Sequence, residues 1–122
     1  MINEKYIDLF VAILTNCAAT AEKAMEYNKE KNDLKAYGTS KSMREEFETL
    51  RDGIRDKRGE FEFTSKNCAT LYIGAYLVAQ ALEKKIAQEQ TVLKGYHEDI
   101  MPKLQAAAKD TSKIDEIFKL NS

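Results

Sequence analysis

The chain has 122 residues, of which 43% are hydrophobic and 32% charged, with 19 Lys and Arg against 20 Asp and Glu. This length suits a single domain with a hydrophobic core, and the near-zero net charge argues against a protein that coats nucleic acid or mimics it, because both need a one-sided electrostatic field. One histidine and two cysteines are too few for multi-ligand zinc sites or a disulfide scaffold.

The composition favours helices over strands. One proline and five glycines interrupt the chain, and the helix-favouring residues Ala, Lys, Glu and Leu are abundant. The N-terminus lacks the basic and apolar regions of a secretory signal, and the uncharged runs are shorter than the roughly 20 residues of a membrane span. We therefore expect a cytoplasmic protein that does not enter a membrane, with Cys17 and Cys68 as packing thiols.

The first predicted helix covers residues 4–29 and carries apolar or small side chains on one face. They recur in steps of three or four residues: Tyr6, Phe10, Ile13, Cys17, Ala21, Ala24 and Tyr27. This spacing is typical of a helix with one packed stripe. The first half of the segment holds further apolar residues beside the stripe, which predicts burial on more than one side.

A loop and a shorter helix are expected next. Residues 30–39 are polar and non-periodic and end near Gly38, which favours a loop. Ser42 followed by Glu45 is typical of a capping box and predicts a second helix over residues 43–58. Glu and Phe alternate over residues 60–63, but no partner strand exists, so we expect a connecting loop in which Phe61 and Phe63 cover the core.

The third predicted helix covers residues 66–94 and is apolar on all sides in its first half, which predicts burial all round. A further helix is expected over residues 97–108. The sequence leaves open whether the chain passes through Gly95 and Pro102 as one bent helix or as two, with Asp99 capping the second. A last short helix is predicted over residues 112–120.

These elements predict an all-α fold: one domain, an elongated helical bundle of three long or medium helices with short C-terminal helical segments. The first and third helices have similar lengths, so we expect them to be neighbours. A lone bundle buries about one stripe per helix, and both helices are apolar beyond that. Either a second copy covers the surplus, which we prefer as a homodimer, or the C-terminal segments fold back over it. The residues expected in self-association are Phe10, Ile13, Leu14, Leu71, Tyr72, Ala75, Tyr76 and Val78.

Two further surfaces are candidates for partner docking. One is a flank of the second helix, where four arginines lie beside an arc of acidic residues: Arg44, Arg51, Arg55 and Arg58. The alternative for this flank is a solvated face whose charges balance, and that balance argues against nucleic-acid binding. The other is the apolar edge of the last helix, which is made by Ile114, Ile117 and Phe118 and which we expect more readily to pack on the bundle.

Catalytic motifs are missing from the sequence. It has no glycine-rich phosphate loop, nucleophile elbow or Cys-x-x-Cys pair, and the lone His97 lacks the Glu three residues earlier that di-iron bundles use. Residues 44–48 are similar to the acidic first motif of the all-α nucleotide pyrophosphohydrolases, but residues 67–82 lack the second acidic motif of that family. We expect no catalytic residue, no cofactor and no metal site.

The sequence thus favours a non-enzymatic oligomeric helical protein that acts through protein–protein interaction, as an adaptor, chaperone, inhibitor or mobile-element accessory protein. Two alternatives remain. One is a nucleic-acid-associated protein that uses the arginine flank, and the other is a small all-α enzyme with a site formed at a dimer interface.

Overall fold

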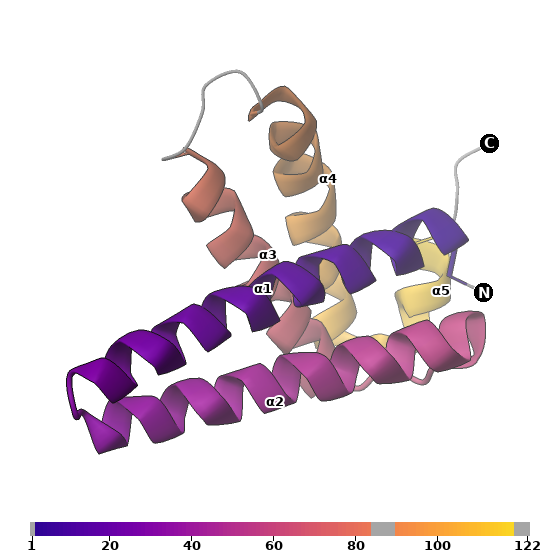
Figure 1. Cartoon of the computed structure of the whole chain (residues 1–122). Coiled ribbons are helices and arrows are strands. Elements are labelled where there is room, and N and C mark those ends of the chain that lie inside the picture. Colours follow the sequence, from indigo (N-terminus) through magenta and orange to yellow (C-terminus); the bar gives the residue numbers. More distant parts are fainter. Residues whose placement is uncertain (1, 84–89, 119–122) are drawn as a thin grey trace.

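The computed structural model describes residues 2–83 and 90–118, with side chains placed over 2–78 and 99–118 (Figure 1). Five α-helices account for most of these residues: α1 (Glu4–Glu30), α2 (Leu34–Lys57), α3 (Ser65–Glu83), α4 (Gln90–Lys109) and α5 (Ile114–Ile117). Short 3-10 turns, Arg58–Glu60 and Thr111–Lys113, follow α2 and precede α5. The described residues contain no strand, so the all-α prediction is confirmed.

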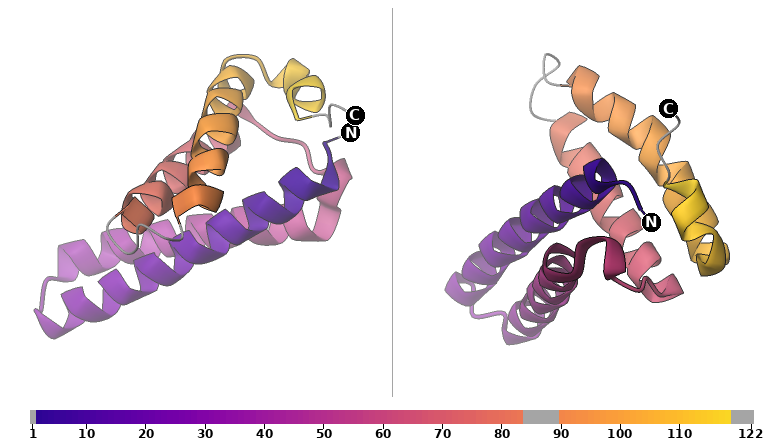
Figure 2. Two further views of the ribbon diagram at one scale, coloured as in Figure 1. Left: turned by 90° about the horizontal axis from the view of Figure 1, so that it is seen from above. Right: turned by 90° about the vertical axis from the view of Figure 1, so that its right-hand side faces the viewer.

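The helices form two antiparallel hairpins that cross. The helix α1 packs along its length against α2, and α3 packs against α4. Figures 1 and 2 show the α3–α4 hairpin standing across one half of the longer α1–α2 hairpin, while α5 returns to the start of α1. The two ends of the described part of the chain lie side by side there: the backbone N–H of Asn3 donates to the carbonyl of Phe118 over 3.1 Å.

The first hairpin turns within residues 31–33. Asn32 takes a left-handed backbone conformation with φ of 56°, which asparagine tolerates. Asp33 then caps α2, because its side chain accepts a hydrogen bond from the backbone N–H of Ala36. The predicted loop over residues 30–39 and the predicted helix start at 43 are therefore wrong. Residues 34–42 lack an apolar period because only one face of this part of α2 is covered, and Ser42 is exposed inside the helix.

The prediction of one helix over residues 66–94 is also wrong. The helix α3 ends at Glu83, and α4 begins at Gln90 and runs back along it; residues 84–89 lie outside the described part. The helix α4 then continues through both Gly95 and Pro102 to Lys109, so it starts earlier than the predicted helix 97–108 and Asp99 is not a cap. Since α1 packs chiefly against α2, the expected pairing of the first and third helices is secondary.

The core lies where the two hairpins cross. Phe10 on α1 makes edge-to-face ring contacts with Phe63, at 5.9 Å between centroids, and with Phe118, at 5.1 Å. Phe61 packs half-buried against Phe63, which confirms the expected connecting loop over the core. Such aromatic pairs stabilise a core by about 1 kcal/mol beyond the area they bury.

Candidate interaction surface

The core contains most of the residues predicted for self-association. Five of them are buried within a single chain: Phe10, Ile13, Leu14, Leu71 and Ala75. Tyr72 and Val78 are half-buried against the same core, and only Tyr76, at 45%, is exposed. The surplus apolar surface of α1 is covered by the chain's own later segments, as the rings of Phe63 and Phe118 show. The buried five are therefore not available to a second copy.

The helix α3 nevertheless keeps an exposed face. The side chains of Ile73, Tyr76 and Leu77 are 53%, 45% and 40% exposed. Lys66 and Ala69 are also exposed and precede them on the same side of the helix. We call these five residues the α3 face. No charged residue occurs in α3 between Lys66 and Glu83, so the face is apolar and neutral over most of its length.

Hydrogen bonds to the neighbouring helices define the two borders of the α3 face. On one border the hydroxyl of Thr70 donates to Glu46 of α2 over 3.3 Å. On the other border Tyr72 accepts a hydrogen bond from the amide of Gln105 on α4 over 3.1 Å. Ile73 lies between these borders on the helical wheel, so it points away from both α2 and α4.

The inner side of α3 crosses α1 at a close contact. A Cβ atom on Gly74 would lie 3.1 Å from the sulfur of Cys17 and 3.4 Å from Ile13, so glycine allows the two helices to approach. The Cys17 thiol donates to the carbonyl of Gly74 over 3.4 Å. Beyond this crossing α3 diverges from the α1–α2 hairpin; we call this part of the hairpin, residues 21–43, the arm (Figure 1).

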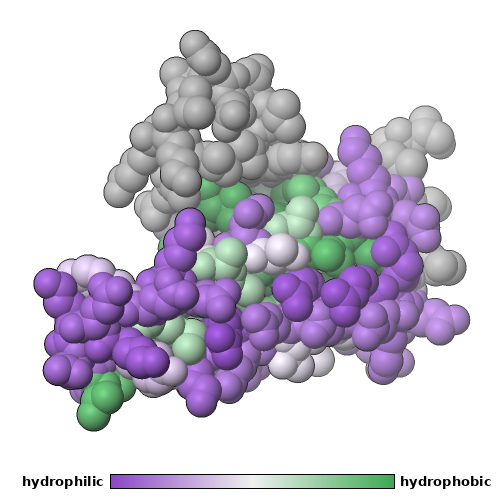
Figure 3. Space-filling view, in the orientation of Figure 1, coloured by the Kyte–Doolittle hydropathy of each residue, from purple (hydrophilic) through white to green (hydrophobic). Residues whose placement is uncertain are grey.

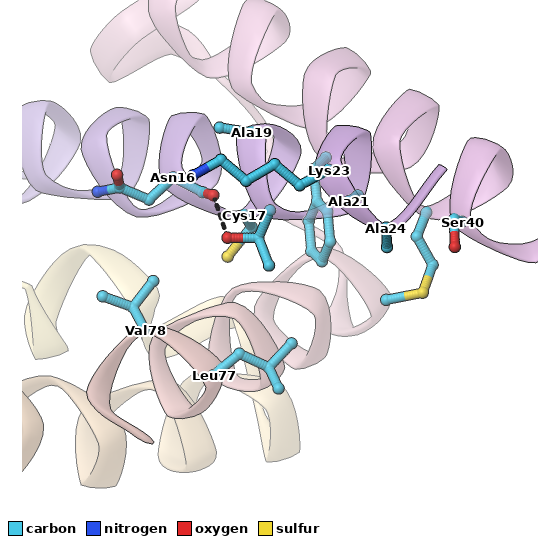
Figure 4. A pocket seen from close by; sticks show the side chains of 12 residues that line it. Asn16, Cys17, Ala19, Ala21, Lys23, Ala24, Ser40, Leu77 and Val78 are labelled. Carbon is cyan, nitrogen blue, oxygen red and sulfur yellow. Dashed lines mark hydrogen bonds between the residues drawn. The ribbon is translucent and has the colours of Figure 1, made fainter. Parts of the chain in front are cut away.

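A pocket of about 370 Å³ opens where α3 leaves the arm. Figure 4 shows Leu77 and Val78 of α3 on one side and α1 on the other. Its walls are mainly apolar: Cys17, Ala19, Ala21, Ala24, Met43, Phe47, Leu77 and Val78, with Asn16, Thr20, Lys23 and Ser40 as the polar members. Leu77 belongs both to this pocket and to the α3 face, so the two form one continuous surface. In Figure 3 apolar residues gather along the seam between the two hairpins.

Neither cysteine provides a reactive group. Burial raises the pKa of the Cys17 thiol, which lines the pocket, to about 11. Burial likewise raises the pKa of Cys68 to about 11. Both are free and buried, so at neutral pH both thiols are protonated and poor nucleophiles. This agrees with the expected packing role.

Each arginine of the predicted docking flank has an acidic partner. Arg44 lies 3.8 Å from Glu48, and Arg51 lies 2.9 Å from Asp52. The remaining pairs are Arg55 with Asp52 and Asp56, and Arg58 with Asp8 and Glu4. The flank is therefore locally neutralised, which is the balanced arrangement that the sequence allowed as the alternative.

The C-terminal candidates belong to the core. Phe118 is fully buried, Ile114 is 9% exposed and Ile117 packs half-buried against them. The apolar edge of the last helix is thus occupied by its own chain, and the predicted docking role of these three residues would require α5 to detach. The helix itself is shorter than predicted, since α5 ends at Ile117.

Sequence reasoning missed Ile73 and Leu77. It interpreted a helix with apolar residues on every side as one that is covered on every side. No signal in the sequence sets these two residues apart, because the exposure of positions 66, 69, 73 and 76 depends on which neighbouring elements cover α3.

Side chains that bind metals do not gather in the described residues. No three His, Cys, Asp or Glu side chains lie close enough there to hold a metal ion. His97 lies in α4, and its side chain is outside the described part.

Over residues 2–83 and 90–118, none of the helices has an apolar stretch of the length that a bilayer span requires. No family model, curated protein or solved structure matches the chain.

Proposed function

We propose that this chain is a non-enzymatic binding protein that acts through protein–protein contact at the α3 face and the adjoining pocket. The observation that carries the proposal is the exposure of Ile73, Tyr76 and Leu77 side by side on a helix face without a charged residue between its ends. Apolar residues that are exposed singly are normal on a protein surface, whereas contiguous exposed ones point to an interaction site.

The energetics favour a protein as the ligand. Full burial of an exposed isoleucine or leucine side chain contributes about 1.5–3 kcal/mol. Ile73 and Leu77 are 53% and 40% exposed, so covering the remainder contributes about half of that each and offsets part of the cost of association. Tyr76 suits the same surface, because a tyrosine buries apolar area while its hydroxyl keeps a polar contact. The partner surface is expected to be apolar and poor in charge.

The charge distribution argues against the nucleic-acid alternative. Phosphate binding needs basic side chains whose charge is available, and the arginines of the predicted docking flank are paired with carboxylates of the same chain. We place the protein in the cytoplasm as part of the proposal, and the two free buried cysteines support a reducing compartment.

Site-specific photocrosslinking in the cells that produce the protein tests this function. A benzophenone amino acid at Ile73 or at Leu77 is expected to give the same discrete protein adduct, identified by mass spectrometry. The matched control is Lys57, an exposed residue at the end of α2 that is not part of the α3 face; it is expected to give no such adduct. The absence of any adduct from Ile73 and Leu77, or the same adducts from all three positions, contradicts the proposal.

A further inference from the structure

We propose that the pocket between α1, α2 and α3 binds a small amphiphilic anion, a molecule with an apolar body and one negatively charged group. The charged group pairs with Lys23 of α1, and the apolar body lies among the apolar walls. This inference goes beyond the proposed function, because it concerns a small molecule inside the pocket and not a protein on the α3 face.

The pocket exists because α1 carries small side chains where α3 diverges from it. Ala21 and Ala24 line the α1 side with one methyl group each, and Leu77 and Val78 line the α3 side (Figure 4). The volume of about 370 Å³ that remains lies within the range of roughly 300–1,000 Å³ that is typical of small-molecule sites. The space therefore suits one small molecule.

The walls of the pocket provide a driving force for an apolar body. Met43 and Phe47 of α2 line it together with Leu77, Val78 and Cys17. The Cys17 thiol adds no charge, because burial raises its pKa to about 11. Met43 and Leu77 are 39% and 40% exposed, so a ligand that covers them removes apolar surface from water.

The polar residues of the pocket lie mainly along one edge. Asn16, Thr20 and Lys23 follow one another on α1 in steps of four and three residues, which places them on one side of the helix. Figure 4 shows Lys23 extended along α1 in the direction of Asn16. The fourth polar residue, Ser40 of α2, accepts a hydrogen bond from Asn28 over 3.2 Å and is thus held by its own chain. A polar edge beside apolar walls is the arrangement that an amphiphile fits.

Lys23 gives this edge a positive charge. Among the described residues that line the pocket it is the one charged side chain, and it forms no ion pair within the described part of the chain, in contrast to the arginines of the predicted docking flank. Its acidic neighbours in sequence, Glu22 and Glu26, do not line the pocket. An anion at the edge is therefore attracted and a cation repelled. Because Lys23 is exposed, this attraction is modest and chiefly selects the sign of the ligand's charge.

Titration calorimetry of the purified full-length protein with decanoate, below the concentration at which decanoate forms micelles, tests the proposal. Saturable binding of one decanoate per chain is expected. Decyltrimethylammonium has the same chain and the opposite charge and is expected to bind more weakly. Butyrate has the charge without the long chain and is expected to give no measurable binding.

Two variants locate the ligand in the pocket. Lys23→Gln is expected to weaken decanoate binding by about two- to fivefold, the effect of losing an exposed ion pair, and to abolish the preference over decyltrimethylammonium. Lys29→Gln is the matched control, since Lys29 lies in the last turn of α1 outside the pocket, and it is expected to bind as wild type does. Ala24→Leu fills the pocket and is expected to abolish binding; circular dichroism and thermal unfolding check that each variant is folded.

Four results overturn the inference: no saturable binding of decanoate to the wild-type protein, equal binding of decanoate and decyltrimethylammonium, equal losses in Lys23→Gln and Lys29→Gln, or unchanged binding by a folded Ala24→Leu variant. If decanoate does not bind while the photocrosslinker at Ile73 captures a discrete protein, the small-molecule ligand is wrong and the proposed function stands. If decanoate binds as expected and no adduct forms, the proposed function fails and this inference stands.

Discussion

The two halves of the α1–α2 hairpin are built from the same helices but are stabilised differently. In the half where the hairpins cross, which we call the base, Ile7, Phe10 and Leu14 are fully buried. In the arm only Ala21 and Met25 reach comparable burial, and neither belongs to the core cluster. The contrast shows that one continuous helix can pack against several elements at one end and chiefly against a single neighbouring helix at the other.

The cause is the number of elements that cover each half. The base is covered by the Phe61–Phe63 loop, α3 and α5 as well as α2. In the arm α1 and α2 chiefly cover each other, so a single stripe per helix suffices and the free side of the arm forms one wall of the pocket. Substitutions in the base should therefore cost more packing energy than substitutions in the arm.

The largest effect is expected for Phe10→Ala in the base. Phe10 is fully buried between the rings of Phe63 and Phe118, and removing a buried phenylalanine costs about 3–5 kcal/mol. Urea denaturation should show this loss in the free energy of unfolding. Tyr27→Ala in the arm is the control, with an expected change within about 0.5 kcal/mol because this ring is 60% exposed. Equal losses at the two sites would contradict the distinction between base and arm.

A smaller effect is expected at the tip of the arm. Asp33→Ala removes the side chain that accepts from the backbone N–H of Ala36, and the loss of such a cap costs about 1 kcal/mol. Ser42→Ala is expected to be neutral or slightly stabilising, because Ser42 lies exposed inside α2 and caps nothing. Urea denaturation of both variants decides between the observed start of α2 and the predicted start at 43; a loss at Ser42 and none at Asp33 would support the latter.

The starts of α1 and α2 show where the sequence was informative and where it was not. The first helix was predicted within one residue because its apolar period is strong from Tyr6 to Tyr27. The start of α2 was not, because a helix covered on one face by a single neighbour needs few apolar residues. The signal at Asp33 is a single capping side chain, which accepts from the backbone N–H three residues further on. Ser42 with Glu45 offered an equally good capping signal in the sequence.

The candidate site was predicted less well than the fold. The sequence identified α3 as the helix with too much apolar surface, and Tyr76 is exposed there. It could not tell which side of α3 the chain itself would cover, since that depends on α4 running back along it and on the crossing at Gly74. Leu71 and Ala75 therefore became core, while Ile73 and Leu77 became surface.

A gain in stability is expected in the arm from Gly38→Ala. A Cβ atom at Gly38 would meet nothing within 4 Å, and alanine in an exposed helix interior is favoured over glycine by about 0.8–1 kcal/mol. Gly74→Ala is the matched comparison: its Cβ would lie 3.1 Å from the Cys17 sulfur, so the helix gain is offset by crowding at the crossing. Thermal unfolding should rank Gly38→Ala above wild type, and a lower midpoint would show that α2 is not continuous through this position.

The smallest effect concerns the edge of the base, where α1 meets α4. The Tyr6 hydroxyl donates to Asp99 over 2.9 Å, and the Lys103 ammonium lies 3.0 Å from the same carboxylate. Partial burial raises the pKa of the Asp99 carboxyl, but the hydrogen bonds from Lys103 and Tyr6 outweigh it and hold the pKa below its ordinary value of 3.8. Because the folded-state pKa is the lower one, this contribution is present above the ordinary value and is lost as pH falls through the folded value.

Asp99→Asn removes that contribution and is expected to cost about 0.5 kcal/mol near neutral pH, a small loss because the side chain is 50% exposed. Unfolding in urea at neutral pH and at about pH 3 should show the difference between wild type and variant shrinking in acid. Glu26→Gln, at an exposed carboxylate of the arm, is expected to match wild type at both pH values. A difference at Asp99 that persists unchanged in acid would mean that the side chain acts through packing and not through its charge, and the joint between α1 and α4 would then resemble the core of the base.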